Sequence, residues 1–387
     1  MAHPGLGYLI DNLDITDQSL YSDVMQPFGH AFKLPALAYQ SKTFSDLEDE
    51  SIWSRSWVAI GSSNEIPQKG DLLPYTVGHH GIHVQRANDN SIIARFNKAQ
   101  HGGCRAVPAQ CQTGNKTKCS FTSCGYSRDS KPINNIEIEE SNAIAHQYLG
   151  VVPERLLHLK TFQAGDYIFV NLDPNSRDNE EPGSLFANKL NQIDQDKKII
   201  YSQWIECEAN WKLICNTIFS ILEPDADLSK INFDNYSDDY NLYWLEFATN
   251  RIFNNNKIDS YTVLWVFPNL FIISFQEYTL SLIIQPTGLR ESIIRVLISS
   301  STHNAFQDPL FINSYTSFTD QIKTSAKSNQ ERFIKISKDK NNESKSIDND
   351  SILEESKYGD YFNKIIAQQI SKKNDYYWNV PLFRNVL

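Results

Sequence analysis

Four of the six cysteines lie close together, in a stretch that also holds a histidine. These potential metal ligands are His101, Cys104, Cys111, Cys119 and Cys124. Structural zinc sites prefer pairs of cysteines with about two to four intervening residues. Cys119 and Cys124 meet that spacing only at its upper limit, and Cys104 and Cys111 are too far apart for a second pair. The stretch therefore favours free thiols, with a substitute metal and a disulfide as the alternatives.

A second group of potential ligands, His79, His80 and His83, lies among short strand-like runs. Two pairs of these histidines are close enough along the chain for chelation. Successive side chains of a strand, however, point to opposite faces of the sheet. We therefore expect surface or turn histidines here, and no metal site.

The acidic balance of the chain limits its partners. Its 387 residues are enough for two domains with separate cores, and its formal net charge is −10. Nucleic acid requires a basic surface, so it is an improbable partner. The first residues lack the cationic start and apolar run of a secretory signal, and no apolar stretch is long enough to span a membrane. The sequence predicts a cytoplasmic protein that binds neither nucleic acid nor membrane.

Hydrophobic periodicity predicts a mixture of helices and strands. Ser45 and Glu48 have the spacing of a capping box at the start of a helix. Strand-like runs follow within residues 72–96 and 156–176, separated by turn residues, and a further series falls within residues 242–298. Alternation and aromatic content in the last series indicate a large antiparallel sheet.

Several motifs in a fixed order carry a resemblance to a known family. They are LPALAY at 34–39, EIPQKGD at 65–71, FVNLDP at 169–174, NWKL at 210–213 and FPN at 267–269. Together they resemble the start, middle and end of the Rieske non-haem iron oxygenase α-subunits, particularly the branch that acts on quaternary amines. The resemblance covers nearly the whole chain, from about Leu34 to Ile370.

The resemblance implies an α+β fold, in which a small Rieske-type β-domain is inserted into a helix-grip (START-like) antiparallel-sheet domain. The implied organisation has three parts. An N-terminal segment, residues 1–56, would pack on the helix-grip domain. Residues 57–176 would form the Rieske-like β-domain, and residues 177–387 the helix-grip domain of the oxygenase type.

The resemblance also places the ligands of a Rieske [2Fe–2S] centre, which the family holds in loops of the form C-x-H and C-x-x-H. The corresponding positions are Ala99 and His101 in the first loop, and Phe121 and Cys124 in the second. Only His101 is of the expected type. Alanine and phenylalanine offer no metal ligand, and Cys124 stands where an imidazole is expected. The resemblance therefore predicts that the cluster is absent.

Active members of the family hold a mononuclear Fe(II) through two histidines and a carboxylate. The resemblance places the histidines at Glu223 and Leu228, and the carboxylate at Asp350. Leucine cannot ligate a metal, and two carboxylates suit magnesium, calcium or manganese better than redox-active iron. Solvated or paired carboxylates are the favoured alternative for Glu223 and Asp350. We therefore expect no cofactor in this chain.

Ser220 stands where the family has an acidic residue that joins the histidines of two metal centres across a subunit boundary. Serine is shorter and is uncharged at neutral pH, so the resemblance predicts that this bridge is lost.

Three aromatic residues, Trp265, Phe267 and Phe275, lie on strands that line the substrate pocket in the family. They could form an aromatic box for a trimethylammonium group by cation–π attraction. Packing in the hydrophobic core is the commoner role of such residues and is the favoured interpretation.

These substitutions predict a catalytically inactive α-subunit homologue that serves as a structural or regulatory subunit of an intact Rieske oxygenase paralogue. Members of the family often form trimers in which electrons cross between subunits. A mixed trimer with two intact subunits and one copy of this chain would then be productive. A trimer with one intact subunit and two copies of this chain would not. A trimer-like homo-oligomer is the other assembly considered. The alternative functions are an active oxygenase or demethylase with altered ligands, and a protein that binds a small ligand, such as a quaternary amine, without chemistry.

Overall fold

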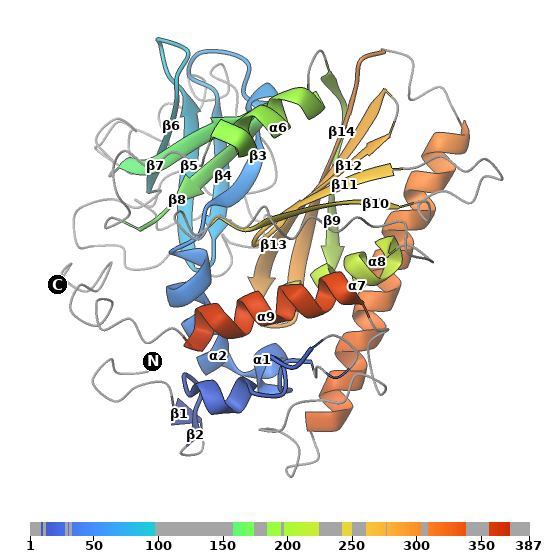
Figure 1. The fold of residues 1–387 in the computed structure, drawn as a ribbon. Helices are drawn as coiled ribbons and strands as arrows, with labels where there is room; N and C mark the ends of the chain where they lie inside the picture. Colours follow the sequence, from blue (N-terminus) through green and yellow to red (C-terminus); the bar gives the residue numbers. More distant parts are fainter. Residues whose placement is uncertain are drawn as a thin grey trace, which may run out of the picture. The chain divides into compact units, whose positions relative to one another are not determined.

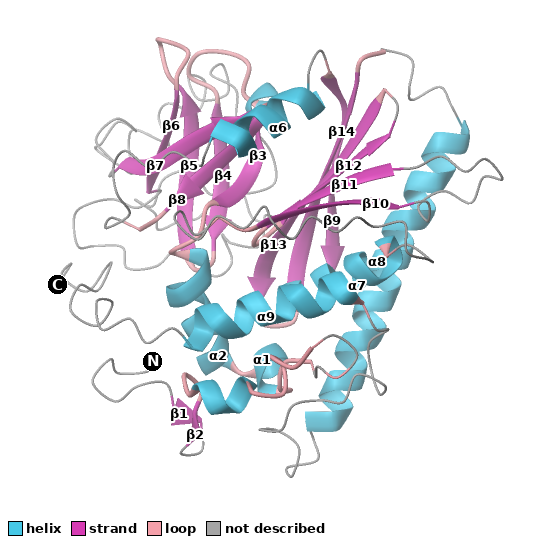
Figure 2. Cartoon of the chain, viewed as in Figure 1, coloured by secondary structure: helices cyan, strands magenta, loops and turns pink. Residues whose placement is uncertain are grey.

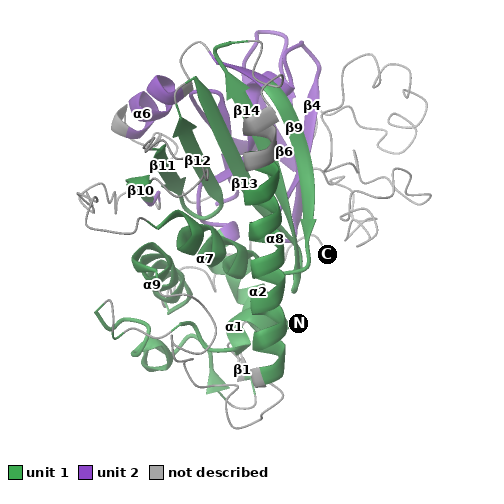
Figure 3. Cartoon of the chain, turned by 90° about the vertical axis from the view of Figure 1, so that its right-hand side faces the viewer, with its two compact units in different colours: residues 1–52, 200–236, 244–380 green, residues 53–199, 237–243, 381–387 purple. Residues whose placement is uncertain are grey.

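The computed structural model divides the chain into two compact units (Figure 3). The first comprises Met1–Ile52, Ile200–Tyr236 and Trp244–Val380, and the second Trp53–Ile199, Ser237–Tyr243 and Pro381–Leu387. The structure describes residues 9–10, 13–27, 30, 33–96, 158–173, 184–194, 197–223, 242–249, 261–275, 277–302, 309–337 and 356–371. The predicted assignment of three segments to a Rieske-like and a helix-grip domain stays a prediction.

The second unit is built on a six-stranded antiparallel sheet, with the strand order β3-β8-β7-β6-β5-β4 (Figures 1 and 2). A capping box, in which Ser62 and Glu65 exchange hydrogen bonds with the backbone, follows the first of these strands. Gly165 forms the tight turn between β7 and β8 with a φ of 55°, a conformation that favours glycine. The elements of this unit are β3 (Val58–Ser62), η3 (Ser63–Glu65), β4 (Leu72–Val77), β5 (His80–Arg86), β6 (Ile92–Phe96), β7 (His158–Ala164), β8 (Tyr167–Asn171) and α6 (Ser184–Asp194).

The FVNLDP motif closes this sheet through polar contacts. Asn171 is buried at the end of β8, and its side-chain oxygen accepts the backbone N–H of Asp173 at 2.8 Å. The Asp173 carboxylate forms a buried ion pair with Arg55 at 2.7 Å. Phe169, from the same motif, packs edge-on against Phe186 of α6. The motif therefore positions the end of β8 within its own unit.

His83 corrects one prediction from the sequence. His79 is exposed in a turn, as expected, but His83 lies in the middle of β5 and is fully buried. Its neighbours Ile82 and Val84 are buried too, so both faces of β5 are covered at this point and alternation gives no exposed side. Burial, and then the nearby positive charge of Arg95, lower the pKa of His83 to about 3. His83 is therefore neutral at physiological pH.

The first unit carries the other six-stranded sheet, with the order β10-β11-β12-β13-β14-β9. Strands β10 to β14 pair antiparallel in sequence order, and β9 lies at the edge beside β14. Together with the helices, the two sheets confirm the predicted α+β fold class. The strands are β9 (Lys198–Cys207), β10 (Trp244–Thr249), β11 (Tyr261–Val266), β12 (Leu270–Phe275), β13 (Tyr278–Gly288) and β14 (Glu291–Ser300).

Helix α7 (Trp211–Leu222) is the central helix of this unit and packs against α8, α9 and β13. Most of its residues are buried, including the polar Lys212, Asn216 and Thr217, as expected of a helix that is covered on several sides. None of the described helices is both long and apolar enough to cross a membrane. The remaining elements of the unit are β1 (Leu9–Ile10), β2 (Leu13–Asp14), η1 (Gln18–Tyr21), α1 (Leu37–Gln40), α2 (Lys42–Glu48), η2 (Asp49–Trp53), α8 (Pro309–Ser337) and α9 (Lys357–Ser371).

The predicted start of the N-terminal helix is corrected by four residues. Helix α2 begins at Lys42, and its cap is Ser41, whose hydroxyl accepts the backbone N–H of Phe44 at 3.3 Å. Ser45, the predicted cap, lies inside the helix. A serine at either position can cap a helix, and burial of Phe44 favours the earlier start.

Candidate functional site

The candidate site lies at the C-terminal end of α7, where the resemblance placed the ligands of the mononuclear iron. Helix α7 starts at a cap formed by Asn210, whose side chain accepts the backbone N–H of Lys212 at 3.1 Å. The amide nitrogen of Asn210 donates to the carbonyl of Leu289 at 2.9 Å, so the helix start is fixed to the β13–β14 turn. This anchorage sets the direction in which Ser220 and Glu223 project.

Glu223 is the C-terminal cap of α7 and links two helices. Its Oε1 accepts the backbone N–H of Lys357, the first residue of α9, at 3.0 Å. The backbone N–H of Glu223 itself donates to the carbonyl of Phe219 at 2.9 Å. Since a carboxylate at a helix N-terminus satisfies a backbone donor and opposes the helix dipole, the contact stabilises the start of α9. Glu223 is therefore held by structural contacts on one of its two oxygens.

The second oxygen of Glu223 is different. Oε2 is buried and receives no hydrogen bond from the described residues. A buried carboxylate oxygen of this kind is suited to a cation or to a donor supplied by another part of the chain.

Ser220 lies in the last turn of α7 and is half-buried. It is close in sequence to Glu223, but the chemistry of its hydroxyl is limited to hydrogen bonding at neutral pH. The predicted loss of an acidic bridge at this position stays a prediction.

Aromatic side chains fill the space between α7, α9, β11 and β12. We call Phe219, Trp265, Phe267, Phe271 and Phe362 the aromatic cluster; all five are buried. Phe219 on α7 stands edge-on to Trp265 at 5.2 Å and to Phe271 at 4.9 Å between ring centroids. Trp265 also meets Phe267 at 6.0 Å and Phe362 at 5.8 Å. The rings therefore contact one another in the edge-to-face geometry typical of a packed core.

Phe275, the third of the aromatic residues for which the sequence left an aromatic box as the alternative to core packing, is not part of this cluster. It is half-buried at the end of β12, and its ring packs on Tyr261 at 4.6 Å. The structure brings Trp265 and Phe267 together and places Phe275 with a different neighbour. The role of these residues as a ligand pocket stays a prediction.

The other predicted site residues lie outside the described part of the chain. They are Ala99, His101, Cys104, Cys111, Cys119, Phe121, Cys124, Leu228 and Asp350. Among the residues that the structure does describe, no three histidine, cysteine or acidic side chains converge as a metal site. The choice between free thiols, a substitute metal and a disulfide in the cysteine-rich stretch stays open.

The two cysteines within the described residues, Cys207 and Cys215, are buried free thiols. Burial raises the pKa of Cys207 to about 11 and also raises the pKa of Cys215. Both remain protonated at physiological pH and are therefore weak nucleophiles and weak metal ligands.

A buried ion pair near the start of α7 was not foreseen from the sequence. The Lys212 ammonium lies 2.5 Å from Glu48 Oε1, and both side chains are almost completely buried. The rings of Tyr39, Phe44 and Trp211 surround the ammonium at 5.3–5.5 Å from their centroids. Burial lowers the pKa of Lys212, and the Glu48 carboxylate opposes that shift. The pair ties α2 to α7.

The known proteins that this chain resembles in sequence are oxygenase subunits. No family model matches the chain. It is 25% identical over 187 residues to the carnitine monooxygenase oxygenase subunit of Acinetobacter baumannii, covering 48% of this chain and 49% of that protein. It is 24% identical over 194 residues to the glycine betaine monooxygenase oxygenase subunit of Pseudomonas aeruginosa, covering 50% and 44%. The chain thus spans about half the length of the curated relatives that it matches.

The fold resembles solved structures over a longer range. A structure of a quaternary ammonium Rieske monooxygenase superposes with a TM-score of 0.60 at 18% identity, covering 91% of this chain and 98% of that one. This likeness extends the agreement in fold well beyond the segments that match in sequence.

The comparisons overturn the prediction that the chain needs no cofactor. Its relatives are Rieske-type oxygenases, which are built around a [2Fe–2S] cluster and a non-haem iron. The prediction depended mainly on Ala99, Phe121 and Leu228, which the structure does not describe, so no loss of ligands is shown. Within the described part of the chain, the buried Oε2 of Glu223 fits one ligand of an iron or another hard cation.

The matches in sequence and the match in fold point to the same kind of protein. The matched relatives are oxygenase subunits, two of them named for carnitine and glycine betaine, and the superposed structure is a Rieske monooxygenase. The chain is therefore similar in sequence to the oxygenase subunits of quaternary-amine monooxygenases, and it shares the fold of a Rieske monooxygenase.

Proposed function

We propose that this chain works in a Rieske oxygenase assembly as a structural or regulatory subunit, beside an intact α-subunit paralogue that carries out the oxygenation. The homology supports a place in such an assembly. The residue types at Ser220 and Glu223, where the resemblance expects an acidic bridge and a histidine ligand, support a role other than turnover.

The observation that carries the proposal is the contact between Glu223 and Lys357. A non-haem iron site that activates oxygen uses two imidazoles and one carboxylate, with the remaining positions open. Here the side chain at the first histidine position is a carboxylate, and one of its oxygens accepts the α9 backbone at 3.0 Å. That oxygen stabilises the helix pair. The position therefore suits a structural role better than an oxygen-activating one.

The aromatic cluster adds support from packing. Its members come from the helices α7 and α9 and from the strand pair β11–β12, and their rings are buried against one another. A core of this kind stabilises the unit as a rigid body. Rigidity is what a scaffold subunit requires.

The test compares three preparations: this chain alone, an oxygenase α-subunit paralogue from the same genome alone, and the two expressed together. Carnitine, glycine betaine and choline serve as substrates, and each preparation is assayed for product, iron content and subunit mass. We expect no product from this chain alone, co-purification with the paralogue, and activity from assemblies with two intact subunits to one of this chain. Iron content is measured separately from product, because bound iron alone does not show that the chain turns over substrate.

Two results would contradict the proposal. Product from this chain alone, supported by bound iron, would make it an active oxygenase with altered ligands. Failure to assemble with any paralogue, combined with saturable binding of one of the three amines, would make it a small-ligand binding protein.

A further inference from the structure

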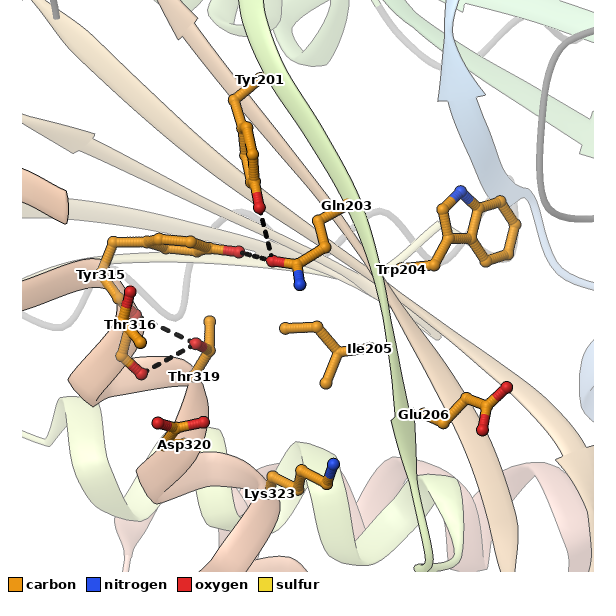
Figure 4. Close-up of a pocket in the computed structure, with 10 residues that line it drawn as sticks. All are labelled: Tyr201, Gln203, Trp204, Ile205, Glu206, Tyr315, Thr316, Thr319, Asp320 and Lys323. Carbon is orange, nitrogen blue, oxygen red and sulfur yellow. Dashed lines mark hydrogen bonds between the residues drawn. The ribbon is translucent and has the colours of Figure 1, made fainter. Parts of the chain in front are cut away.

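A groove of about 490 Å³ lies between the edge strand β9 and helix α8 of the first unit (Figure 4). Its position follows from local geometry, since alternate residues of a strand share a face and residues three or four apart on a helix do the same. The side chains used in the argument are Tyr201, Gln203 and Ile205 from β9, and Tyr315, Asp320 and Lys323 from α8. None of them belongs to the candidate site described above.

The amide of Gln203 is fixed by two phenols. Tyr201 and Tyr315 both donate to Gln203 Oε1, at 2.8 Å and 2.9 Å. Burial, and then the neighbouring Tyr201, raise the pKa of Tyr315, so this phenol keeps its proton and remains a donor. With its oxygen occupied by two donors, the amide must present its nitrogen to the groove, as Figure 4 shows. The Gln203 nitrogen therefore offers N–H donors in a fixed direction.

Two opposite charges line the helix side of the groove. Asp320 and Lys323 are three residues apart on α8, a spacing that places Cβ atoms about 5–6 Å apart. Neither makes an ion pair with any other residue that the structure describes. One turn later, by contrast, the ammonium of Lys327 is paired with Glu208 at 2.6 Å. The ammonium of Lys323 points towards β9 in Figure 4, on the same side as the Gln203 amide.

We propose that this groove binds a small zwitterion that carries a carboxylate and an ammonium group joined by a short methylene chain. The Gln203 amide and the Lys323 ammonium would hold the carboxylate, Asp320 would hold the ammonium, and Ile205 would face the methylene groups. The volume lies within the range of about 300–1,000 Å³ typical of small-molecule sites. A formal net charge of −10 disfavours a simple anion, whereas a zwitterion is neutral overall.

The binding test uses the full chain and a series of ω-amino acids of increasing length: glycine, β-alanine, 4-aminobutyrate and 5-aminovalerate. Isothermal titration calorimetry measures each affinity. The Cβ spacing of Asp320 and Lys323 on α8 predicts that 4-aminobutyrate or 5-aminovalerate binds best, with a Kd of about 1 mM or tighter. Butyrate and butylamine each lack one charge, and we expect each to bind at least about tenfold more weakly than 4-aminobutyrate.

Two variants assign the charges, and a third is the matched control. Lys323→Gln should weaken 4-aminobutyrate binding at least about tenfold. Asp320→Asn should weaken the binding of 4-aminobutyrate but leave the affinity for butyrate unchanged. Lys327→Gln removes a lysine of the same helix that is already paired, and it should change affinity by less than about twofold. Unchanged thermal melting of each variant shows that the fold is kept.

The proposal is overturned if none of the four amino acids binds. It is also overturned if butyrate binds as tightly as 4-aminobutyrate, or if Lys323→Gln has no larger effect than Lys327→Gln. The groove lies on residues separate from Glu223, so these outcomes are independent of the test of oxygenase assembly.

Discussion

The Glu223 carboxylate and the backbone N–H of Lys357 lie 3.0 Å apart and join two helices whose contacting residues are separated by 134 positions in the sequence. Glu223 closes α7, and Lys357 opens α9. The last turn of one helix and the first turn of the other are thus held by a single side chain, at the position where the resemblance expects a metal ligand.

Removal of this contact should destabilise the chain. We expect Glu223→Ala to lower the free energy of unfolding by about 1 kcal/mol, the typical effect of losing a side-chain cap. Glu223→Gln keeps an oxygen acceptor and should lose less. Urea denaturation followed by circular dichroism measures both values.

The control for this series is Glu291→Gln, which changes an exposed glutamate on β14 of the same unit. Its free energy of unfolding should stay within about 0.5 kcal/mol of the wild type. If Glu223→Ala lowers the free energy of unfolding no more than Glu291→Gln does, the contact does not stabilise the fold. The case for a non-catalytic role at this position then weakens.

The ion pair between Lys212 and Glu48 should behave as a buried pair. Lys212→Met or Glu48→Gln alone leaves one charged or polar group buried without its partner, and each should lower the free energy of unfolding by about 3–5 kcal/mol. The double variant removes both charges and should lose less than the sum of the two single changes. A double-mutant cycle by urea denaturation measures the coupling.

An exposed pair provides the comparison for that cycle. Lys42 and Asp46 are 2.7 Å apart on α2, but the Lys42 side chain is 77% exposed. Lys42→Ala should therefore change the free energy of unfolding by less than about 1 kcal/mol. Equal effects at the two pairs would mean that burial does not strengthen the Lys212–Glu48 contact.

His83 should make the stability of the chain depend on pH. Its pKa is about 3 in the folded state, against 6.5 for the ordinary group. Between these values the unfolded state binds a proton and the folded state does not, so stability is complete above about pH 6.5 and falls as the pH is lowered. The slope from one such group is about 1.4 kcal/mol per pH unit.

The measurement is the urea midpoint between pH 7 and pH 4, for the wild type and for His83→Gln. The variant should show a shallower decline, because it removes one proton uptake by the unfolded state. His158→Gln replaces an exposed histidine of the same sheet and should keep the wild-type slope. Identical slopes for wild type and His83→Gln would show that His83 is protonated without unfolding.

Local patterns predicted the strands well and the buried polar groups poorly. Strands β4 and β12 lie within the stretches predicted at 72–96 and 242–298, because alternation and turn residues are properties of the local sequence. Lys212 and His83 gave no such signal. Their burial depends on tertiary neighbours, such as Glu48 for Lys212 and Arg95 for His83, that are distant from them in sequence or share no pattern with them.

The candidate site shows the same division. The resemblance identified Glu223 and Ser220 as positions of interest, because the motif around α7 is continuous in sequence. It could not indicate that Lys357 would meet Glu223, or that Gln203 and Lys323 would face one groove, since each pair joins segments far apart in the chain. Cofactor content was predicted wrongly because single residue types at aligned positions were given more weight than the similarity of the whole chain to cofactor-containing oxygenases.

The close approach of α7 and α9 gives the last prediction. A Cβ added at Gly359 would lie 2.9 Å from Asn216 Oδ1, closer than such atoms ordinarily approach. Asn216 cannot turn away freely, because its side chain exchanges two hydrogen bonds with Asn363, each 3.1 Å long, and donates to the carbonyl of Lys212. Although alanine is the better helix former, the clash should prevail, and Gly359→Ala should lower the free energy of unfolding by about 1–3 kcal/mol.

Gly288→Ala is the matched control, because its new Cβ would meet Glu291 at an ordinary 3.5 Å. Thermal and urea unfolding should leave this variant close to the wild type. Asn216→Ala in the background of Gly359→Ala removes the atom that clashes, so the double variant should be destabilised by less than the sum of the two single changes. Additive effects would mean that the two helices separate to admit the methyl group. In that case the polar contacts between α7 and α9, including the Glu223 cap, would not hold the helices at a fixed distance.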